Sequence, residues 1–254
     1  MSTISTTRLL ELLNEERRGA AVMAFDGDGT LWSGDVAEDV FDVAVERGLI
    51  REDAHAELLA SARAHGVDAR GTPSELAGRI FRAYQEGRFP EREVCEVMTW
   101  CFAGWSVAEL ERFAREALTE LRLAERFNPS LDGVLAWAHE AEVRVVIVSA
   151  SPQSIVEQAA HLRGIAAENV SAGMPELDGA TILPKMASPI PYGADKLRAA
   201  ERFFRDGAQW LASFGDSLFD LELLKAARLG VAVRPKPELR EKIERLRSGY
   251  VLSE

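Results

Sequence analysis

Residues that form disulfides or bind zinc are scarce in this chain. Cysteine occurs only twice among 254 residues, and the spacing of Cys95 and Cys101 matches no metal-binding motif. Two thiols cannot supply a disulfide framework either, so we interpret them as apolar residues of a reduced protein. The four histidines are scattered and form no H-E-x-x-H zinc helix; they are His55, His65, His139 and His161. These absences argue against a disulfide scaffold and a histidine-based metal site.

Positive charge is also in short supply. Lysine and arginine number 30 against 41 aspartates and glutamates, a net charge of -11 that repels nucleic acids and anionic membranes. A small anionic substrate remains compatible, because the local field of a site can oppose the field of the whole molecule. The first residues lack the positive segment and apolar run of a signal peptide, and no stretch has the length to span a bilayer. We therefore expect a cytoplasmic protein without nucleic-acid or membrane partners.

The first part of the chain predicts one helix and one buried strand. Hydrophobic residues make up 47% of the sequence, enough for a substantial core. Residues 5–18 carry leucines at helical spacing, which indicates an amphipathic helix. Residues 20–25 form a short apolar run that stops at the segment 26–30, which reads DGDGT. This pattern is typical of a buried strand that ends in a polar loop.

A long helical region follows this loop, and we predict no strand between residues 31 and 125. Thr72 and Ser106 each stand three residues before a glutamate, which is the spacing of a capping box at a helix start. Apolar residues recur at helical spacing after both of them. Asn128 and Pro129 end the region, because this dipeptide favours a turn.

From residue 130 onward, strands and helices are predicted to alternate. We expect strands over residues 142–149, 209–214 and 229–233, a hairpin over 169–183, and helices starting near 153, 194, 219 and 238, the last ending at 247. Such alternation predicts an α/β fold with a Rossmann-like, doubly wound parallel sheet. Residues 1–33 and 127–254 would form the core, and residues 34–126 an inserted helical cap domain.

The loop 26–30 holds two carboxylates that flank a single residue. Ligands of doubly wound sheets bind at the carboxyl ends of strands, which is where Asp26 and Asp28 stand. Two close carboxylates repel each other unless a cation lies between them, and they can also divide the roles of nucleophile and acid. The alternative is an ordinary Asp-Gly turn in which Asp26 caps a neighbouring group.

Three further segments place polar residues at the ends of strands or helices. Ser149 ends a β-branched strand, so its hydroxyl and the following N–H groups, beginning with Ala150, suit phosphate binding or the capping of a helix. Lys196 opens a helix, where a lone lysine is usually a solvated surface residue. Asp216 and Asp220 follow another strand and suggest a hard cation with oxygen ligands.

Taken together and in this order, the four motifs resemble those of the haloacid dehalogenase superfamily. They are Asp26-x-Asp28-x-Thr30, Ser149 after an apolar strand, Lys196, and Gly215 and Asp216 followed by Asp220. The resemblance covers residues 20–34 and 127–250, and the helical insertion has the position of the family's cap. The serine segment and the residues before Lys196 look most like the phosphoserine-phosphatase-like branch.

This resemblance implies a covalent mechanism with Mg²⁺ as cofactor. Asp26 would attack phosphorus to form an aspartyl-phosphate, and Asp28 would protonate the leaving alcohol and then activate water. The metal would be held by Asp26, the backbone carbonyl of Asp28 and Asp216. Dehalogenases lack an acid at the position of Asp28, so its presence favours phosphoryl transfer over C–Cl cleavage.

The same resemblance assigns supporting roles to other core residues. Ser149, Ala150 and Lys196 would hold the phosphoryl oxygens. Asp220 would support the metal site or orient Lys196, and Thr30 would brace the loop. These residues touch the phosphoryl group or the metal, which every phosphomonoester offers, so they do not identify the substrate.

The cap carries the residues that would select the substrate. Phosphoserine phosphatases bind the amino acid with an early cap acid and a cap arginine, which would be Asp35 and Arg79 here unless both are surface residues. Phe219 replaces the usual asparagine, and Ser149 is followed by Ala-Ser-Pro rather than Gly-Gly, which argues against phosphoserine itself. Three aromatic residues either line an apolar pocket or, as we prefer, pack inside the cap: Trp100, Phe102 and Trp105.

We predict a Mg²⁺-dependent phosphohydrolase that acts on a small phosphorylated metabolite. A phosphotransferase or phosphomutase with the same aspartyl-phosphate is one alternative, and a phosphoserine phosphatase proper is another. A non-catalytic binding protein of this fold is a third, but such relatives usually lose an acid, and the motif acids and lysine are all present. The sequence does not indicate an oligomeric state.

Overall fold

The core of the protein is a seven-stranded sheet in which all strands run parallel. The computed structural model describes residues 3–204, 207–243, 246 and 248–253. The strand order across the sheet is β1-β9-β8-β7-β2-β3-β4. The bounds are β1 Thr3–Ile4, β2 Ala21–Phe25, β3 Arg144–Pro152, β4 Val170–Gly173, β7 Gln209–Gly215, β8 Leu229–Val233 and β9 Gly249–Leu252. The predicted α/β fold class is confirmed.

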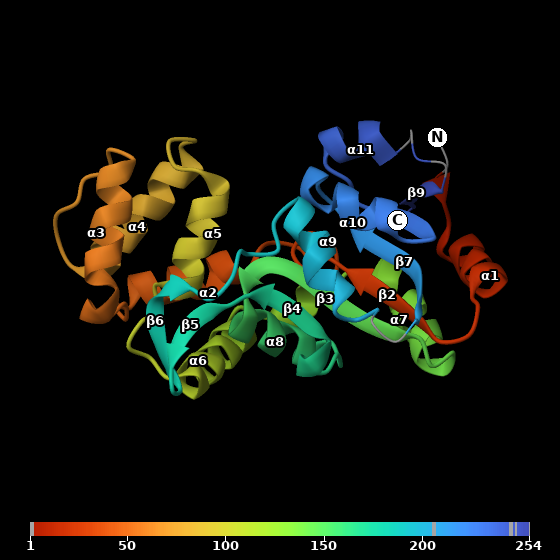
Figure 1. Ribbon diagram of the computed structural model, residues 1–254, viewed down its shortest axis with the longest axis horizontal. Coiled ribbons are helices and arrows are strands. Elements are labelled where there is room, and N and C mark those ends of the chain that lie inside the picture. Colours follow the sequence, from red (N-terminus) through yellow and green to blue (C-terminus); the bar gives the residue numbers. More distant parts are fainter. Residues whose placement is uncertain (1–2, 205–206, 244–245, 247, 254) are drawn as a thin grey trace.

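Helices cover both faces of this sheet (Figure 1). In β2, Met23 and Phe25 point into the core cluster that holds α1 and α8, whereas Val22 and Ala24 point into the cluster that holds α9 and α10. A strand covered on both faces is apolar throughout, which explains the continuous run of β2. The helices are α1 Thr6–Glu16, α7 Asp132–Glu140, α8 Gln153–Leu162, α9 Ala194–Glu201, α10 Leu221–Ala226 and α11 Pro237–Ile243.

Of the six α-helices between β2 and β3 in the described chain, the first five lie before residue 126, in the predicted insertion. They are α2 Val36–Glu46, α3 His55–Ala64, α4 Pro73–Gln85, α5 Glu91–Trp100 and α6 Val107–Glu120. Thr72 and Ser106 form the predicted capping boxes with Glu75 and Glu109. As predicted, residues 31–125 contain no strand, only isolated bridges. Figure 1 shows α3, α4 and α5 at the end of the molecule opposite to α1.

The hairpin prediction for residues 169–183 is correct only in part. Residues 170–173 instead form β4, which adds to the edge of the main sheet, and the antiparallel hairpin consists of β5 Pro175–Asp178 and β6 Thr181–Met186. The backbone of Ile182 exchanges hydrogen bonds with that of Gly104 and Trp105, each at 2.9 Å. The hairpin is therefore joined to the loop between α5 and α6, next to which it lies in Figure 1.

The ends of the chain hold two strands that the sequence patterns did not predict. β1 and β9 pair in parallel at one edge of the sheet, and each is at most four residues long, too short to show an alternation. The last helix was predicted to reach residue 247. Residues 244, 245 and 247 lie outside the described residues, and α11 ends at Ile243 within them. No helix in the described ranges has the length and apolarity to cross a membrane.

Candidate active site

The loop after β2 begins the site, because the carboxyl end of β2 lies beside that of β7. The Asp26 amide donates to the carbonyl of Phe214 at 2.9 Å, and the Phe25 and Phe214 rings stack with centroids 4.2 Å apart. Gly29 has φ +80°, and a Cβ atom there would lie 2.4 Å from Oδ2 of Asp216. Glycine adopts this φ without strain and has no Cβ atom to collide with Asp216. The loop after β2 can therefore lie directly against the loop that follows β7.

Four buried charged residues form what we call the floor: Asp26, Lys196, Asp216 and Asp220. None is more than 5% exposed. Lys196 Nζ donates to Oδ1 of Asp26 at 2.5 Å and to Oδ1 of Asp220 at 2.6 Å. A fifth residue, Thr30, donates its hydroxyl to Oδ2 of Asp26 at 3.2 Å. The structure thus brings together residues that lie up to 194 positions apart in the sequence.

Asp220 anchors the floor to the backbone. Its Oδ2 accepts hydrogen bonds from the amides of Asp216 and Ser217, at 3.1 and 3.0 Å, and from the Ser217 hydroxyl at 3.1 Å. Its Oδ1 is left for Lys196. Because both oxygens are engaged, Asp220 holds Lys196 in a fixed position beneath Asp26.

The electrostatics of the floor favour an added cation. Burial raises the pKa of Asp26, Asp220 raises it further, and Lys196 opposes both. Burial also raises the pKa of Asp216, which Lys236 opposes from 3.3 Å. Burial disfavours the Lys196 ammonium, yet the carboxylates of Asp220 and Asp26 raise its pKa above the ordinary value. Three carboxylates therefore share one buried ammonium group, Lys196, and one exposed ammonium group, Lys236, which leaves an excess of negative charge.

The donor set of the floor fits a hard divalent cation. Carboxylate oxygens of Asp26, Asp216 and Asp220 lie within 4.8 Å of one another, and all three residues are buried. Hard cations such as Mg²⁺ take carboxylate and carbonyl oxygens as ligands. The expected ligands Asp26 and Asp216 are thus side by side. The Asp28 side chain is not in this group among the described residues.

Asp28 is held by donors from two sides. Its Oδ1 accepts from Trp32 Nε1 at 2.7 Å and from the amide of Val36 at 2.8 Å. Its Oδ2 accepts from the hydroxyl of Ser151 at 2.7 Å. Ser149, which was predicted to end this strand but lies inside β3 because β3 continues to Pro152, accepts from the Ser151 amide at 3.1 Å. The end of β3 therefore meets the loop after β2 through Ser151.

A small cavity of about 90 Å³ opens at this point. Asp26, Asp28, Ser149, Ala150 and Lys196 line it together, as the motifs predicted. A second group of lining residues, which we call the wall, consists of Asp35, Glu91, Cys95, Tyr192 and Phe219. Ser151, Ser217 and Lys236 complete the lining.

The wall carries two carboxylates in different settings. Asp35 is the N-cap of α2, and its Oδ1 accepts from the amides of Ala37 and Glu38 at 2.8 and 3.0 Å. Burial raises the pKa of Asp35, and Asp28 raises it further. Glu91 is exposed and accepts from the Tyr192 hydroxyl at 3.4 Å. Among the described residues, no lysine, arginine or histidine forms an ion pair with either acid.

Two predicted features of the cap lie away from the cavity. Arg79 donates from Nε to the backbone carbonyl of Asp68 at 2.9 Å and does not line the cavity. Trp100, Phe102 and Trp105 are buried, and Trp105 packs its ring against Phe102 and Phe113, with centroids 5.7 and 5.4 Å apart. The interpretation of this aromatic cluster as packing within the helical region is confirmed.

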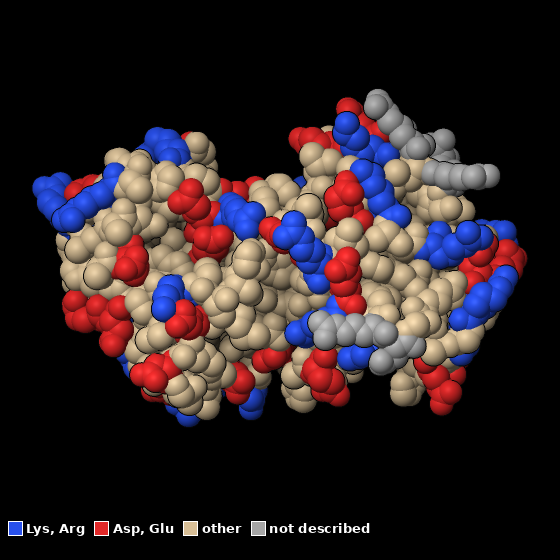
Figure 2. All heavy atoms as spheres, in the orientation of Figure 1, with Lys and Arg blue, Asp and Glu red and all other residues tan. Residues whose placement is uncertain are grey.

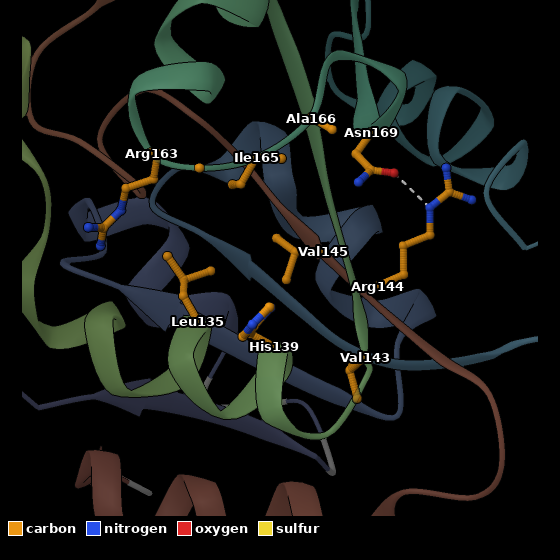
Figure 3. Close-up of a pocket in the computed structure, with 10 residues that line it drawn as sticks. Leu135, His139, Val143, Arg144, Val145, Arg163, Ile165, Ala166 and Asn169 are labelled. Atoms are coloured by element: carbon orange, nitrogen blue, oxygen red, sulfur yellow. Dashed lines mark hydrogen bonds between the residues drawn. The ribbon is translucent and has the colours of Figure 1, made fainter.

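A larger hollow of about 390 Å³ lies at the amino end of β3 (Figure 3). It is lined around the start of β3, by Val143, Arg144 and Val145 among others. Figure 3 shows Arg144 reaching Asn169, with an Nε–Oδ1 distance of 2.7 Å. Among the residues that the structure describes, no aspartate or glutamate and none of the motif residues line it. We therefore assign the chemistry to the smaller cavity at the carboxyl ends of the strands.

Several lining residues escaped the sequence analysis. Lys236 follows the carboxyl end of β8, so the strand-end rule that found Asp216 would have found it too. Ser151 follows Ser149 and Ala150 in the sequence, but the motif that contains them predicts no role for Ser151. Glu91, Cys95 and Tyr192 reach the cavity only through the packing of α5 and of the loop before α9, for which the sequence contains no signal.

Comparisons with known folds agree with this geometry. A solved protein of unknown function from Anaerococcus prevotii DSM 20548 is 17% identical, with 96% of this chain and 91% of that chain covered and a TM-score of 0.72. One of unknown function from Bordetella pertussis Tohama I is 18% identical, with 93% and 99% covered and a TM-score of 0.67. A substrate-bound phosphoserine phosphatase is 14% identical, with 94% and 95% covered and a TM-score of 0.56.

Sequence comparison identifies the family. A search of curated proteins finds no match to this chain. The family model for haloacid dehalogenase-like hydrolases matches residues 23–225, which include all four motifs and the helical insertion. The likeness to the solved structures shows a shared fold, and the family match extends over most of the chain. The protein belongs to the haloacid dehalogenase-like hydrolase family.

Proposed function

We propose that this protein is a Mg²⁺-dependent phosphohydrolase that cleaves a small phosphomonoester through an aspartyl-phosphate on Asp26. The observation that carries the proposal is the setting of Asp26. Its carboxylate is buried at a strand end, held by Lys196 and Thr30, adjacent to two further aspartates and open to a cavity that Asp28 also lines. A carboxylate fixed in this way is a suitable nucleophile, and a second acid is within reach of its target.

In the first step, an Asp26 oxygen bonds to phosphorus as the bond from phosphorus to the leaving oxygen breaks. Asp28 gives its proton to that oxygen, so an alcohol departs. Lys196, Ser149 and the amide of Ala150, which line the cavity, would hold the phosphoryl oxygens. A magnesium ion on Asp26, Asp216 and the Asp28 carbonyl would neutralise the phosphoryl charge that otherwise repels the nucleophile.

In the second step, Asp28 takes a proton from water, and the water oxygen bonds to phosphorus. The bond between phosphorus and Asp26 breaks, which releases inorganic phosphate and restores the carboxylate. Asp220 takes no part in bond making and instead fixes Lys196, as its hydrogen bonds indicate. Asp28 thus acts first as acid and then as base.

Residues 34–126 would serve as the cap that contacts the leaving group. Asp35 and Glu91 contribute the wall, and the floor binds the phosphoryl group. The two lysines of the cavity, Lys196 and Lys236, are both paired with floor aspartates. No basic side chain of the wall is thus available for a substrate carboxylate, and Arg79 lies elsewhere. We infer a neutral or cationic leaving group rather than phosphoserine.

A phosphate-release screen tests this function. Purified protein with Mg²⁺ is incubated with p-nitrophenyl phosphate and a panel of alkyl, aminoalkyl and sugar phosphates, with and without added alcohols as acceptors. We expect release of inorganic phosphate from several members and loss of release in Asp26→Asn. Release that persists unchanged in Asp26→Asn would contradict the proposal. Transfer to an added alcohol in place of water would instead identify a phosphotransferase.

A further inference from the structure

The indole of Trp32 is fixed against the catalytic loop. Trp32 is fully buried, and its Nε1 donates to Oδ1 of Asp28 at 2.7 Å. A Cβ atom at Gly27 would lie 2.8 Å from the indole ring, so the ring lies directly on the loop backbone. The amide of Gly29 also donates to the Trp32 carbonyl at 2.8 Å. Loop and tryptophan therefore form one packed unit.

The two oxygens of Asp28 have different kinds of partner. Oδ1 accepts from Trp32 Nε1 and from the Val36 amide, two groups that can only donate. Oδ2 accepts from the hydroxyl of Ser151, which can either donate or accept. Ser151 lines the cavity, whereas Trp32 and Val36 do not. Oδ1 is thus held from behind, and Oδ2 is the oxygen on the cavity side.

We propose that Trp32 is a positioning residue that fixes Oδ1 of Asp28, so that Oδ2 exchanges the proton with the leaving group and with water. This inference rests on the proposed function, because it concerns the acid of that reaction. Trp32 itself touches no substrate. The Ser151 hydroxyl donates to Oδ2, so the proton on Oδ2 can point at the leaving oxygen, and no other group has to move when it is transferred.

The donors on Oδ1 both come from the attachment of the helical region. Trp32 lies in the entering linker and forms a bridge with Phe127 of the returning linker, beside which the Ser33 amide donates to the Arg126 carbonyl at 3.0 Å. Val36 is the first residue of α2. Ser151, by contrast, belongs to the end of β3 in the core. The placement of Asp28 therefore depends on how the helical region is joined to the sheet.

Replacement of Trp32 by phenylalanine isolates the N–H group. Trp32→Phe keeps an aromatic ring on Gly27 but removes the donor to Asp28. The proton matters for a basic alkoxide leaving group and little for p-nitrophenolate, which departs without it. We expect the rate of the first step, measured as release of the alcohol or phenol in a single turnover, to fall about tenfold or more for propyl phosphate, as for a lost hydrogen bond to a charged group. For p-nitrophenyl phosphate it should change less than about threefold.

Trp137→Phe is the matched control. The Trp137 indole donates to Oδ1 of Asn14 at 3.1 Å, away from the cavity, so its loss should alter neither rate. The alkyl-to-aryl ratio is measured within each variant and does not depend on how much of the protein is folded. KM should stay within about twofold for both substrates in Trp32→Phe, because the residue does not line the cavity.

The outcomes separate this inference from the proposed function. A wild-type protein that releases no phosphate from any substrate would contradict the proposed function and the inference with it. An active wild type whose alkyl-to-aryl ratio is unchanged by Trp32→Phe, or whose two rates fall equally, would overturn the role of Trp32 alone. A selective loss for the alkyl ester with unchanged KM supports it.

Discussion

The floor and the wall of the cavity are built in opposite ways. Every charge of the floor is buried and paired, with Lys196 shared between Asp26 and Asp220 and Lys236 beside Asp216. In the wall, Asp35 caps a helix and Glu91 is exposed, and among the described residues neither has an ion-pair partner. A fixed floor suits the phosphoryl group, which all substrates share. A loosely constrained wall suits the leaving group, which differs between them.

The origin of each region explains the difference. Floor residues follow strands of one parallel sheet or begin a helix that packs on it, so backbone pairing sets their positions. The wall acids Asp35 and Glu91 stand at the starts of helices, where an acid has a second role at the helix N-terminus. Outside the cavity, acidic and basic side chains are interspersed over the face seen in Figure 2. The clustered charge of the floor is a local feature.

Removal of the metal should have the largest effect on the floor. Without a divalent cation, three carboxylates and an incoming phosphate face the ammonium groups of Lys196 and the exposed Lys236, so negative charge is in excess. We expect phosphate release to fall at least about a thousandfold in excess chelator, since the loss of several kcal/mol of charge stabilisation is worth that much. Added Mg²⁺ should restore it. Full activity in chelator would show that the floor aspartates serve another purpose.

Lys196→Met should affect both stability and activity. It leaves Asp26 and Asp220 buried without their partner, and breaking a buried ion pair costs roughly 3–5 kcal/mol. We expect that loss in the free energy of unfolding by denaturant titration, together with a fall in kcat of about a hundredfold. Lys185→Met is the control, because its exposed pair with Glu176 contributes at most about 1 kcal/mol. Equal effects of the two variants would contradict the description of the floor.

The smallest expected effect sharpens the description of the wall. Glu91→Gln should lower kcat/KM for 2-aminoethyl phosphate relative to propyl phosphate by about two- to fivefold, the range of an exposed ion pair. Glu96→Gln, on the same helix but outside the cavity lining, should leave the ratio unchanged. Arg79→Ala should also leave it unchanged, since Arg79 lies elsewhere. If Glu91→Gln leaves the ratio of the two kcat/KM values unchanged, Glu91 does not take part in substrate recognition.

The sequence predicted the floor well and the wall poorly, for a physical reason. A strand that ends in a polar residue places it at a known end of a parallel sheet, so the pattern alone predicted that Asp26 and Asp216 lie close together. The residues that surround Asp35 and Arg79 depend on how the helices pack, and a local sequence pattern does not predict that packing. The contact of Trp32 with Asp28 depends on a side-chain conformation in a linker. The division of residues 170–186 between β4 and the hairpin likewise depends on a tertiary contact with the loop between α5 and α6.

The most direct test of the account is detection of the phosphoenzyme on Asp26. The protein is mixed with p-nitrophenyl phosphate and Mg²⁺, quenched in acid within milliseconds, digested, and examined by mass spectrometry for a phosphorylated peptide that contains residues 21–30. The account predicts phosphate on Asp26, labile to hydroxylamine, and none in Asp26→Asn or in excess chelator. Turnover without any phosphorylated Asp26, or phosphate on another residue, would contradict it.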